Sequence, residues 1–139
     1  MAERRIHLNI GSECNNNCLF CMEQDRQGRR RVNGALDHDR IRAILEERRG
    51  ADEVCFTSGE PTLVSALPRY IRWASQLGYP RVSLMTNGRR LAYADYCARL
   101  VDSGLNHFYI SVHGHTARLH DGLVRTPGAF AQTVTGLDN

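Results

Sequence analysis

Three cysteines stand close together near the N-terminus of the sequence: Cys14, Cys18 and Cys21. The C-x3-C-x2-C spacing lets three thiolates wrap one face of a cuboidal iron–sulfur cluster, each binding one iron, while the fourth iron has no protein ligand. Thiolates also bind zinc, but structural zinc usually takes two well-separated ligand pairs, and the sequence has no second CxxC or HxxxH pair. The spacing therefore favours an iron–sulfur site, with structural zinc as the alternative.

Further polar clusters follow strand-like segments and could bind a ligand. They are Ser-Gly-Glu-Pro at residues 58–61, Thr-Asn-Gly at 86–88 and Ser-Val-His-Gly at 111–114. Glu60 could accept a hydrogen bond from an ammonium group, which a site for an amino acid zwitterion requires. Taken alone, residues 58–61 fit a common turn. His113, His115 and His120 fit loop histidines better than ligands of a second metal.

The elements that must position these clusters alternate between strand-like and helical patterns. Short apolar runs predict strands at residues 6–10, 54–57, 82–85 and 107–112. Four helices are predicted between and after these strands. The first has Asp37 as its N-cap, the second begins near Ser65, and the third contains Cys97, Leu100 and Val101. The fourth has Thr126 as its N-cap, with Phe130, Val134 and Leu137 on one face. This alternation predicts an α/β fold of four βα units: a parallel sheet covered on one face, with functional loops at the carboxyl ends of the strands.

The cysteine segment resembles the characteristic motif of radical S-adenosylmethionine (radical SAM) enzymes, C-x3-C-x-aromatic-C, with Phe20 in the aromatic position. Residues 58–61 resemble that family's Gly-Gly-Glu-Pro segment, with Ser58 in place of the first glycine. The resemblance implies a [4Fe-4S] cluster on the three cysteines and S-adenosylmethionine (SAM) on the open iron. It also implies that an electron from the reduced cluster breaks the S–C5′ bond of SAM, and that the 5′-deoxyadenosyl radical abstracts hydrogen from a substrate.

The same resemblance assigns ligand contacts along the chain. Residues 58–61 would bind the amino group of SAM, the ends of the third and fourth strands would meet SAM or substrate, and Phe20 would lie near the adenine ring. The implied metal ligands are Cys14, Cys18 and Cys21, and the implied cofactor-binding residues are Phe20, Ser58, Gly59, Glu60, Pro61, Thr86, Asn87, Ser111 and His113. No separate catalytic residue is assigned.

The sequence departs from the family in the number of repeating units. The family's usual core is a partial barrel of six βα units, whereas four are predicted here, so we expect a truncated half-barrel: an incomplete radical SAM core domain over residues 1–139. The alternatives are a cluster-binding domain without turnover and a structural zinc protein. Expected partners are a flavodoxin- or ferredoxin-like electron donor and a small-molecule or peptide substrate. A second copy or another protein is expected to cover the open sheet edge.

Composition limits the other function classes. The 139 residues are 42% hydrophobic with a net charge of +3, and this weakly basic balance does not by itself indicate nucleic acid binding. No apolar run approaches the roughly 20 residues of a membrane span, and the first residues lack the apolar stretch of a secretory signal, so we expect the cytoplasm. Cys55 and Cys97 are expected to be small buried hydrophobic residues.

Overall fold

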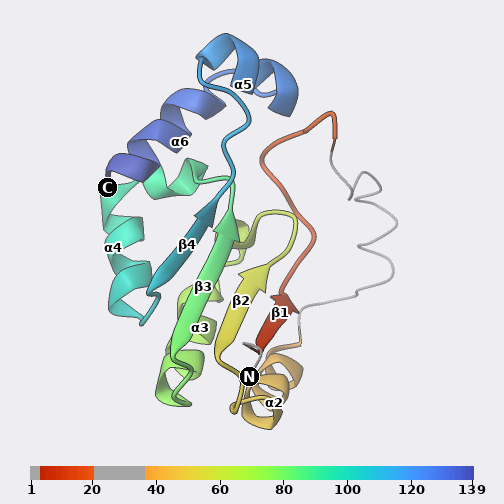
Figure 1. Cartoon of the computed structure of the whole chain (residues 1–139), viewed down its shortest axis with the longest axis vertical. Coiled ribbons are helices and arrows are strands. Elements are labelled where there is room, and N and C mark those ends of the chain that lie inside the picture. The colour runs from red at the N-terminus through yellow and green to blue at the C-terminus, as the bar shows by residue number, and fades with distance from the viewer. Residues whose placement is uncertain (1–3, 21–36) are drawn as a thin grey trace.

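The computed structural model describes residues 4–20 and 37–139 and has an α/β architecture (Figure 1). In this part of the chain a sheet of four parallel strands has the order β1-β2-β3-β4, so each strand pairs with its neighbour in the sequence. The strands are β1 (Arg5–Asn9), β2 (Glu53–Thr57), β3 (Arg81–Thr86) and β4 (His107–Ile110). The predicted fold class is confirmed. β4 is shorter than predicted, so Ser111 lies in the loop beyond it, together with His113.

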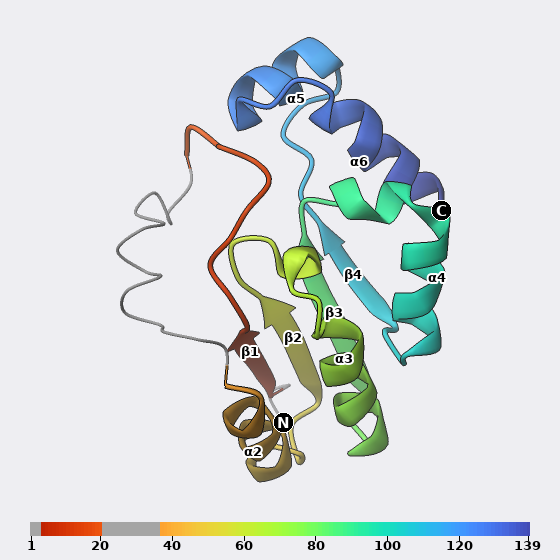
Figure 2. The same cartoon turned by 180° about the vertical axis from the view of Figure 1, so that it is seen from behind.

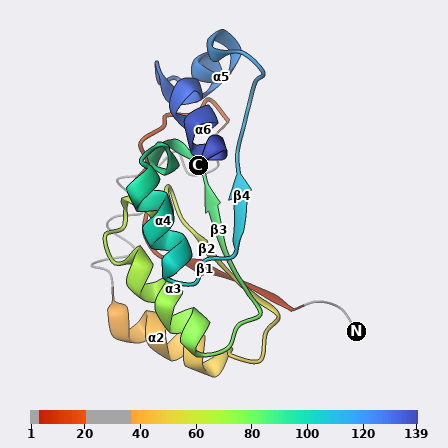
Figure 3. The same ribbon diagram turned by 90° about the vertical axis from the view of Figure 1, so that its left-hand side faces the viewer.

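Helices cover one face of the sheet, as the views from behind and from the side show (Figures 2 and 3). They are α2 (His38–Glu47), α3 (Leu67–Gln76) and α4 (Ala94–Asp102), with short 3-10 turns η1 (Pro61–Leu63) and η2 (Arg89–Ala92) beyond the ends of β2 and β3. α2 begins at its predicted N-cap, where the Asp37 side chain accepts a hydrogen bond from the Arg40 N–H (3.1 Å). Among the described residues, no helix combines the length and apolar character that a membrane crossing needs.

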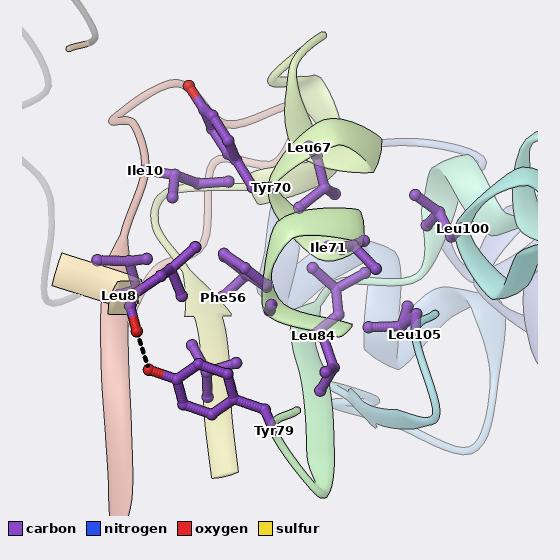
Figure 4. Packing of buried hydrophobic residues seen from close by; sticks show 14 of the residues in the cluster. Leu8, Ile10, Phe56, Leu67, Tyr70, Ile71, Tyr79, Leu84, Leu100 and Leu105 are labelled. Atoms are coloured by element: carbon purple, nitrogen blue, oxygen red, sulfur yellow. Dashed lines mark hydrogen bonds between the residues drawn. The ribbon is translucent and has the colours of Figure 1, made fainter. Parts of the chain in front are cut away.

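The hydrophobic core lies between the sheet and these helices (Figure 4). Alternate strand residues point toward the helices, so Val54 and Phe56 of β2 are fully buried. The same cluster contains Leu67 and Ile71 of α3, Leu84 of β3 and Leu100 of α4. Full burial of such a side chain contributes about 1.5–3 kcal/mol. The Tyr79 hydroxyl donates to the Leu45 carbonyl oxygen (2.9 Å), which ties the segment before β3 to α2.

The opposite face of the sheet carries a buried polar network. Glu53 of β2 is fully buried, and its carboxylate accepts hydrogen bonds from Arg5 Nε (2.8 Å), Ser83 Oγ (2.6 Å) and the Tyr109 hydroxyl (3.0 Å). Arg81 adds a second ion pair, with 3.3 Å between its Nη1 and Glu53 Oε2. A buried carboxylate needs such partners, because an isolated one would lose its hydration without compensation. The network therefore links all four described strands.

The C-terminal part of the chain differs from the sequence prediction. Residues expected to form a loop instead form α5 (Ala117–Val124), which is capped by the side chain of Thr116. The last helix, α6 (Ala129–Asp138), begins after Gly128, whose φ is 83°. The predicted N-cap at Thr126 is therefore wrong, because a left-handed glycine directs the chain into the helix two residues later than expected.

The buried face of α6 also differs from the predicted one. Val134 and Leu137 of the predicted apolar face are 37% and 53% exposed. The buried residues are Ala129, Thr133 and Gly136. A Cβ atom on Gly136 would lie 2.5 Å from the Gly88 carbonyl oxygen, so α6 contacts the turn after β3 backbone to backbone. Small residues occupy this face because larger side chains would prevent that approach.

The two isolated cysteines are buried, as predicted. Cys55 is 0% and Cys97 is 9% exposed, and burial raises the pKa of both thiols. Leu100 is also buried on α4, but Val101 is 50% exposed, so the apolar stripe of this helix is narrower than predicted. Neither thiol has the lowered pKa that marks a reactive cysteine.

Candidate functional site

Four segments of the chain meet at the carboxyl ends of the parallel strands (Figure 1). Residues 10–20, 58–61 and 111–114 follow β1, β2 and β4, and residues 86–89 begin at the last residue of β3. The Ile10 N–H donates to the Thr57 carbonyl oxygen (3.1 Å), and the Ser111 N–H donates to the Thr86 carbonyl oxygen (3.0 Å). The strand ladders thus continue into these segments and bring the predicted site residues to one edge of the sheet.

Gly59 lets the segment after β2 contact residues 10–20, the loop that carries Cys14 and Cys18 and is called the cysteine loop below. A Cβ atom on Gly59 would lie 2.4 Å from the Glu13 carbonyl oxygen and 2.7 Å from that of Ser12, which is closer than real Cβ atoms approach. The neighbouring Glu60 N–H donates to the same Glu13 oxygen (2.6 Å). Glycine is therefore required here by close packing of two backbones.

Glu60 connects the ends of β2 and β3. Its side chain is 1% exposed, and Oε1 accepts hydrogen bonds from the hydroxyls of Thr62 (2.6 Å) and Thr86 (2.5 Å). Oε1 also accepts the Thr62 N–H (3.2 Å), while Oε2 accepts the Asn87 N–H (2.8 Å). A carboxylate offers about four acceptor positions, so Oε2 retains one for a further donor. Sequence reasoning gave Glu60 a ligand role and missed this connecting role.

The cysteine loop contains two of the three predicted metal ligands. Cys14 and Cys18 are both half-buried, and the Asn16 N–H donates to the Cys14 sulfur (3.4 Å). Cys21 lies outside the described residues. Within residues 4–20 and 37–139, no three His, Cys, Asp or Glu side chains gather into a metal-binding group. The three-cysteine site therefore stays a prediction.

The loop after β4 meets the cysteine loop through aromatic rings. The ring centroids of Phe20 and His113 are 4.5 Å apart, and the His113 N–H donates to Nδ1 of His120 (3.1 Å). Burial lowers the pKa of His113, with a contribution from His120, so the His113 ring is neutral at neutral pH. His115 is exposed, whereas His120 is 1% exposed within α5, so it is no solvated loop residue.

Comparison with known proteins identifies the family. The sequence pattern of the Radical SAM superfamily matches residues 8–139. The chain belongs to the radical SAM superfamily. The match includes all four segments that meet at the carboxyl ends of the strands, so the resemblance seen in the motifs extends through this radical SAM chain.

Several radical SAM relatives are similar over most of the chain. A "Probable GTP 3',8-cyclase" from Methanopyrus kandleri is 31% identical over 136 residues, covering 97% of this chain and 42% of that protein. An "AdoMet-dependent heme synthase" from Oleidesulfovibrio alaskensis is 28% identical over 137 residues, covering 97% and 34%. A "7,8-dihydro-6-hydroxymethylpterin dimethyltransferase" from Methanocaldococcus jannaschii is 28% identical over 112 residues, covering 78% and 22%. The chain thus spans less than half the length of these curated relatives.

The described residues fit the cluster and SAM that radical SAM enzymes use. Cys14 and Cys18 supply thiols, the soft ligands that iron–sulfur clusters require. Ser58 Oγ is buried and has no hydrogen-bond partner among the described residues, which leaves a hydroxyl for a ligand at the same edge of the sheet. Both the donor set and this unpartnered hydroxyl suit the superfamily's cofactors.

The structure also adds residues that sequence reasoning missed. The three asparagines between Cys14 and Cys18 accept hydrogen bonds from side chains that lie far along the sequence. Asn87 and Arg89 donate to the first two asparagines, and Arg125 donates to the third. The run of three asparagines is a turn signal in the sequence. Nothing in the sequence distinguishes either arginine from the other basic residues.

Proposed function

We propose that this radical SAM chain holds a [4Fe-4S] cluster on the thiolates of Cys14, Cys18 and Cys21 and binds SAM at the fourth iron. The observation that carries the proposal is the docking of the cysteine loop on the segment after β2, through the hydrogen bond between Glu60 N–H and the Glu13 carbonyl oxygen (2.6 Å). When bound, the cluster and SAM would supply a 5′-deoxyadenosyl radical by one-electron reduction, for hydrogen abstraction from a substrate.

Residues 58–61 are proposed to bind the amino group of SAM. An ammonium group donates hydrogen bonds, and two acceptors are available: Ser58 Oγ and the remaining position on Glu60 Oε2. Gly59 keeps this backbone against the cysteine loop, and the ring of Pro61 restricts the backbone angle φ at the first residue of η1. The segment thereby presents its acceptors next to the loop that carries the thiols.

The ends of β3 and β4 are proposed to form the neighbouring wall of the ligand site. Its polar residues are Thr86, Asn87, Ser111 and His113. Phe20 and the neutral His113 ring offer aromatic faces on which the adenine ring of SAM would stack. Polar and aromatic groups at one edge suit a nucleoside that carries an amino acid.

Partners are proposed from the chemistry of the site and the exposed sheet edge. A low-potential donor similar to flavodoxin or ferredoxin would reduce the cluster, and the substrate would be a small molecule or a peptide. β4 is the last strand of the described sheet, and the backbone groups at such an edge are open to pairing. A second copy of the chain or another protein would cover this edge.

Anaerobic reconstitution tests the proposed function. The 139-residue chain is incubated with iron and sulfide, assayed for both, and then given dithionite and SAM. Bound cluster together with 5′-deoxyadenosine supports the proposal. Cluster without this product indicates a cluster-binding domain without turnover, and stoichiometric zinc without iron indicates a structural zinc protein.

A pair of cysteine variants identifies the ligands. Cys18→Ala is expected to lose most of the bound iron, because the cluster then lacks one of its thiolates. Cys97→Ala, which changes a buried thiol on α4, is expected to keep the wild-type iron content. Equal iron in both variants would contradict the assignment of Cys18.

A further inference from the structure

The end of β3 holds the loop between the two described cysteines. Asn87 Nδ2 donates to Asn15 Oδ1 (2.6 Å). The Arg89 guanidinium donates through Nη1 to the Asn15 carbonyl oxygen and to Asn16 Oδ1, the latter at 3.2 Å. Asn16 is 4% exposed, so the guanidinium reaches the inner side of the loop.

The Arg89 side chain is held from its other side as well. Its Nε donates to Gln132 Oε1 on α6 (2.7 Å). The backbone N–H of Arg89 donates to Asn87 Oδ1 (3.1 Å), which fixes the backbone at this residue. Every acceptor that the guanidinium has among the described residues is a neutral amide or carbonyl oxygen, and no described carboxylate pairs with it. A half-buried cation with only neutral acceptors favours an anion beside the loop.

We infer that Arg89 is a positioning residue for the cysteine loop and that its positive charge raises the reduction potential of the cluster bound there. This inference rests on the proposed function. A cluster with thiolate ligands gains one negative charge on reduction, and a nearby cation stabilises that form. The same guanidinium therefore fixes the loop backbone through its hydrogen bonds and tunes the cluster through its charge.

Two variants change this charge in different ways. Arg89→Gln removes it, and Gln132→Glu neutralises it by placing a carboxylate at Nε while the bonds to the loop remain. In a redox titration of the reconstituted chain, a solution reductant gives one electron to each cluster, and electron paramagnetic resonance measures the reduced form. At a fixed solution potential, the ratio of reduced to oxidised cluster is expected to be about fivefold lower in both variants than in the wild type.

Matched controls make the same chemical changes on the far helices. Arg42→Gln on α2 and Gln76→Glu on α3 alter exposed residues away from the cysteine loop, and both are expected to keep the wild-type ratio (Figure 1). If Arg89→Gln and Gln132→Glu bind iron and also keep that ratio, the role of the charge is overturned. A wild-type chain that binds no iron would overturn the proposed function, and this inference with it.

Amide hydrogen exchange tests the positioning role in the metal-free chain. Arg89→Gln is expected to speed exchange across residues 14–18 by about tenfold, because the loop loses two hydrogen bonds. Gln132→Glu keeps both bonds and is expected to leave the exchange unchanged. Equal protection in the wild type and Arg89→Gln would contradict the positioning role, whichever result the redox titration gives.

Discussion

At the scale of single residues, the neighbours Ser58 and Gly59 after β2 have different roles. Residue 59 must be glycine, because a Cβ atom there would lie 2.4 Å from the carbonyl oxygen of Glu13. Ser58, where the superfamily commonly has glycine, keeps a buried hydroxyl without a partner among the described residues. Gly59 allows two loops to come into contact, and Ser58 leaves a polar atom for a ligand.

Ser58→Ala is expected to have opposite effects on stability and on ligand binding. In the ligand-free chain it should raise the free energy of unfolding by about 1 kcal/mol, since it removes a buried hydroxyl that lacks a partner. In the reconstituted chain it should weaken SAM binding about tenfold, measured by isothermal titration calorimetry.

Ser103→Ala provides the comparison. It removes a hydroxyl that donates to the Arg99 carbonyl oxygen (2.8 Å), so it should lower stability and leave SAM binding unchanged. A Ser58→Ala chain that is less stable than the wild type and binds SAM equally well would show that Ser58 is a structural residue.

At the scale of elements, the strand ends are held together by polar side chains. The carboxylate of Glu60 accepts hydrogen bonds from residues that follow both β2 and β3, and Thr133 of α6 donates to the Asn87 carbonyl oxygen (2.9 Å). These contacts fix segments that have few apolar residues of their own. The site edge therefore depends on hydrogen bonds, whereas the sheet below it depends on packing.

Thr86→Val tests this dependence. The variant keeps the shape of the side chain but removes the hydroxyl that donates to Glu60 (2.5 Å) and accepts the Gly88 N–H (3.1 Å). Because a hydrogen bond to a buried carboxylate is lost, the free energy of unfolding in urea should fall by about 2 kcal/mol. Thr135→Val, which changes an exposed residue of α6, should stay within about 0.5 kcal/mol of the wild type. Equal effects of the two variants would rule out the role given to Thr86.

At the scale of the whole molecule, the sheet has two unlike faces. One packs against α2, α3 and α4, as Figure 3 shows, and the other carries the Glu53 network, which includes residues of all four described strands. Burial alone would raise the pKa of Glu53, but hydrogen bonds from Ser83, Tyr109 and Arg5, with the Arg5 charge, lower it to about 2. The network thus joins the first described strand to the last through one ionised carboxylate.

This pKa predicts how stability responds to acid. The ordinary pKa is 4.5 and the folded value is lower, so the contribution is complete above pH 4.5 and is lost as the pH falls through about 2. Glu53→Gln should remove about 3 kcal/mol of pH-dependent stability over this range, measured by urea unfolding at several pH values. Glu46→Gln, in an exposed pair with Arg42, should change the profile little. An unaltered acid profile in Glu53→Gln would contradict the assigned pKa.

The sequence by itself determined the features that depend on local pattern. Four apolar runs with helical segments between them predicted the parallel sheet, and parallel strands place their carboxyl ends at one edge, so the predicted segments meet there. The start of α2 at Asp37 was also predictable, because an N-cap bonds only its own first turn.

Only the tertiary structure decided which residues far apart in the sequence are in contact. Arg89 and Asn15 are 74 positions apart, and α6 turns Gly136 inward because the backbone at Gly88 lies against it. α5 was missed because its segment was interpreted from isolated histidines. Helix faces, buried carboxylates and positioning arginines depend on partners that become neighbours only when the chain folds, and neither residue type nor periodicity records those distances.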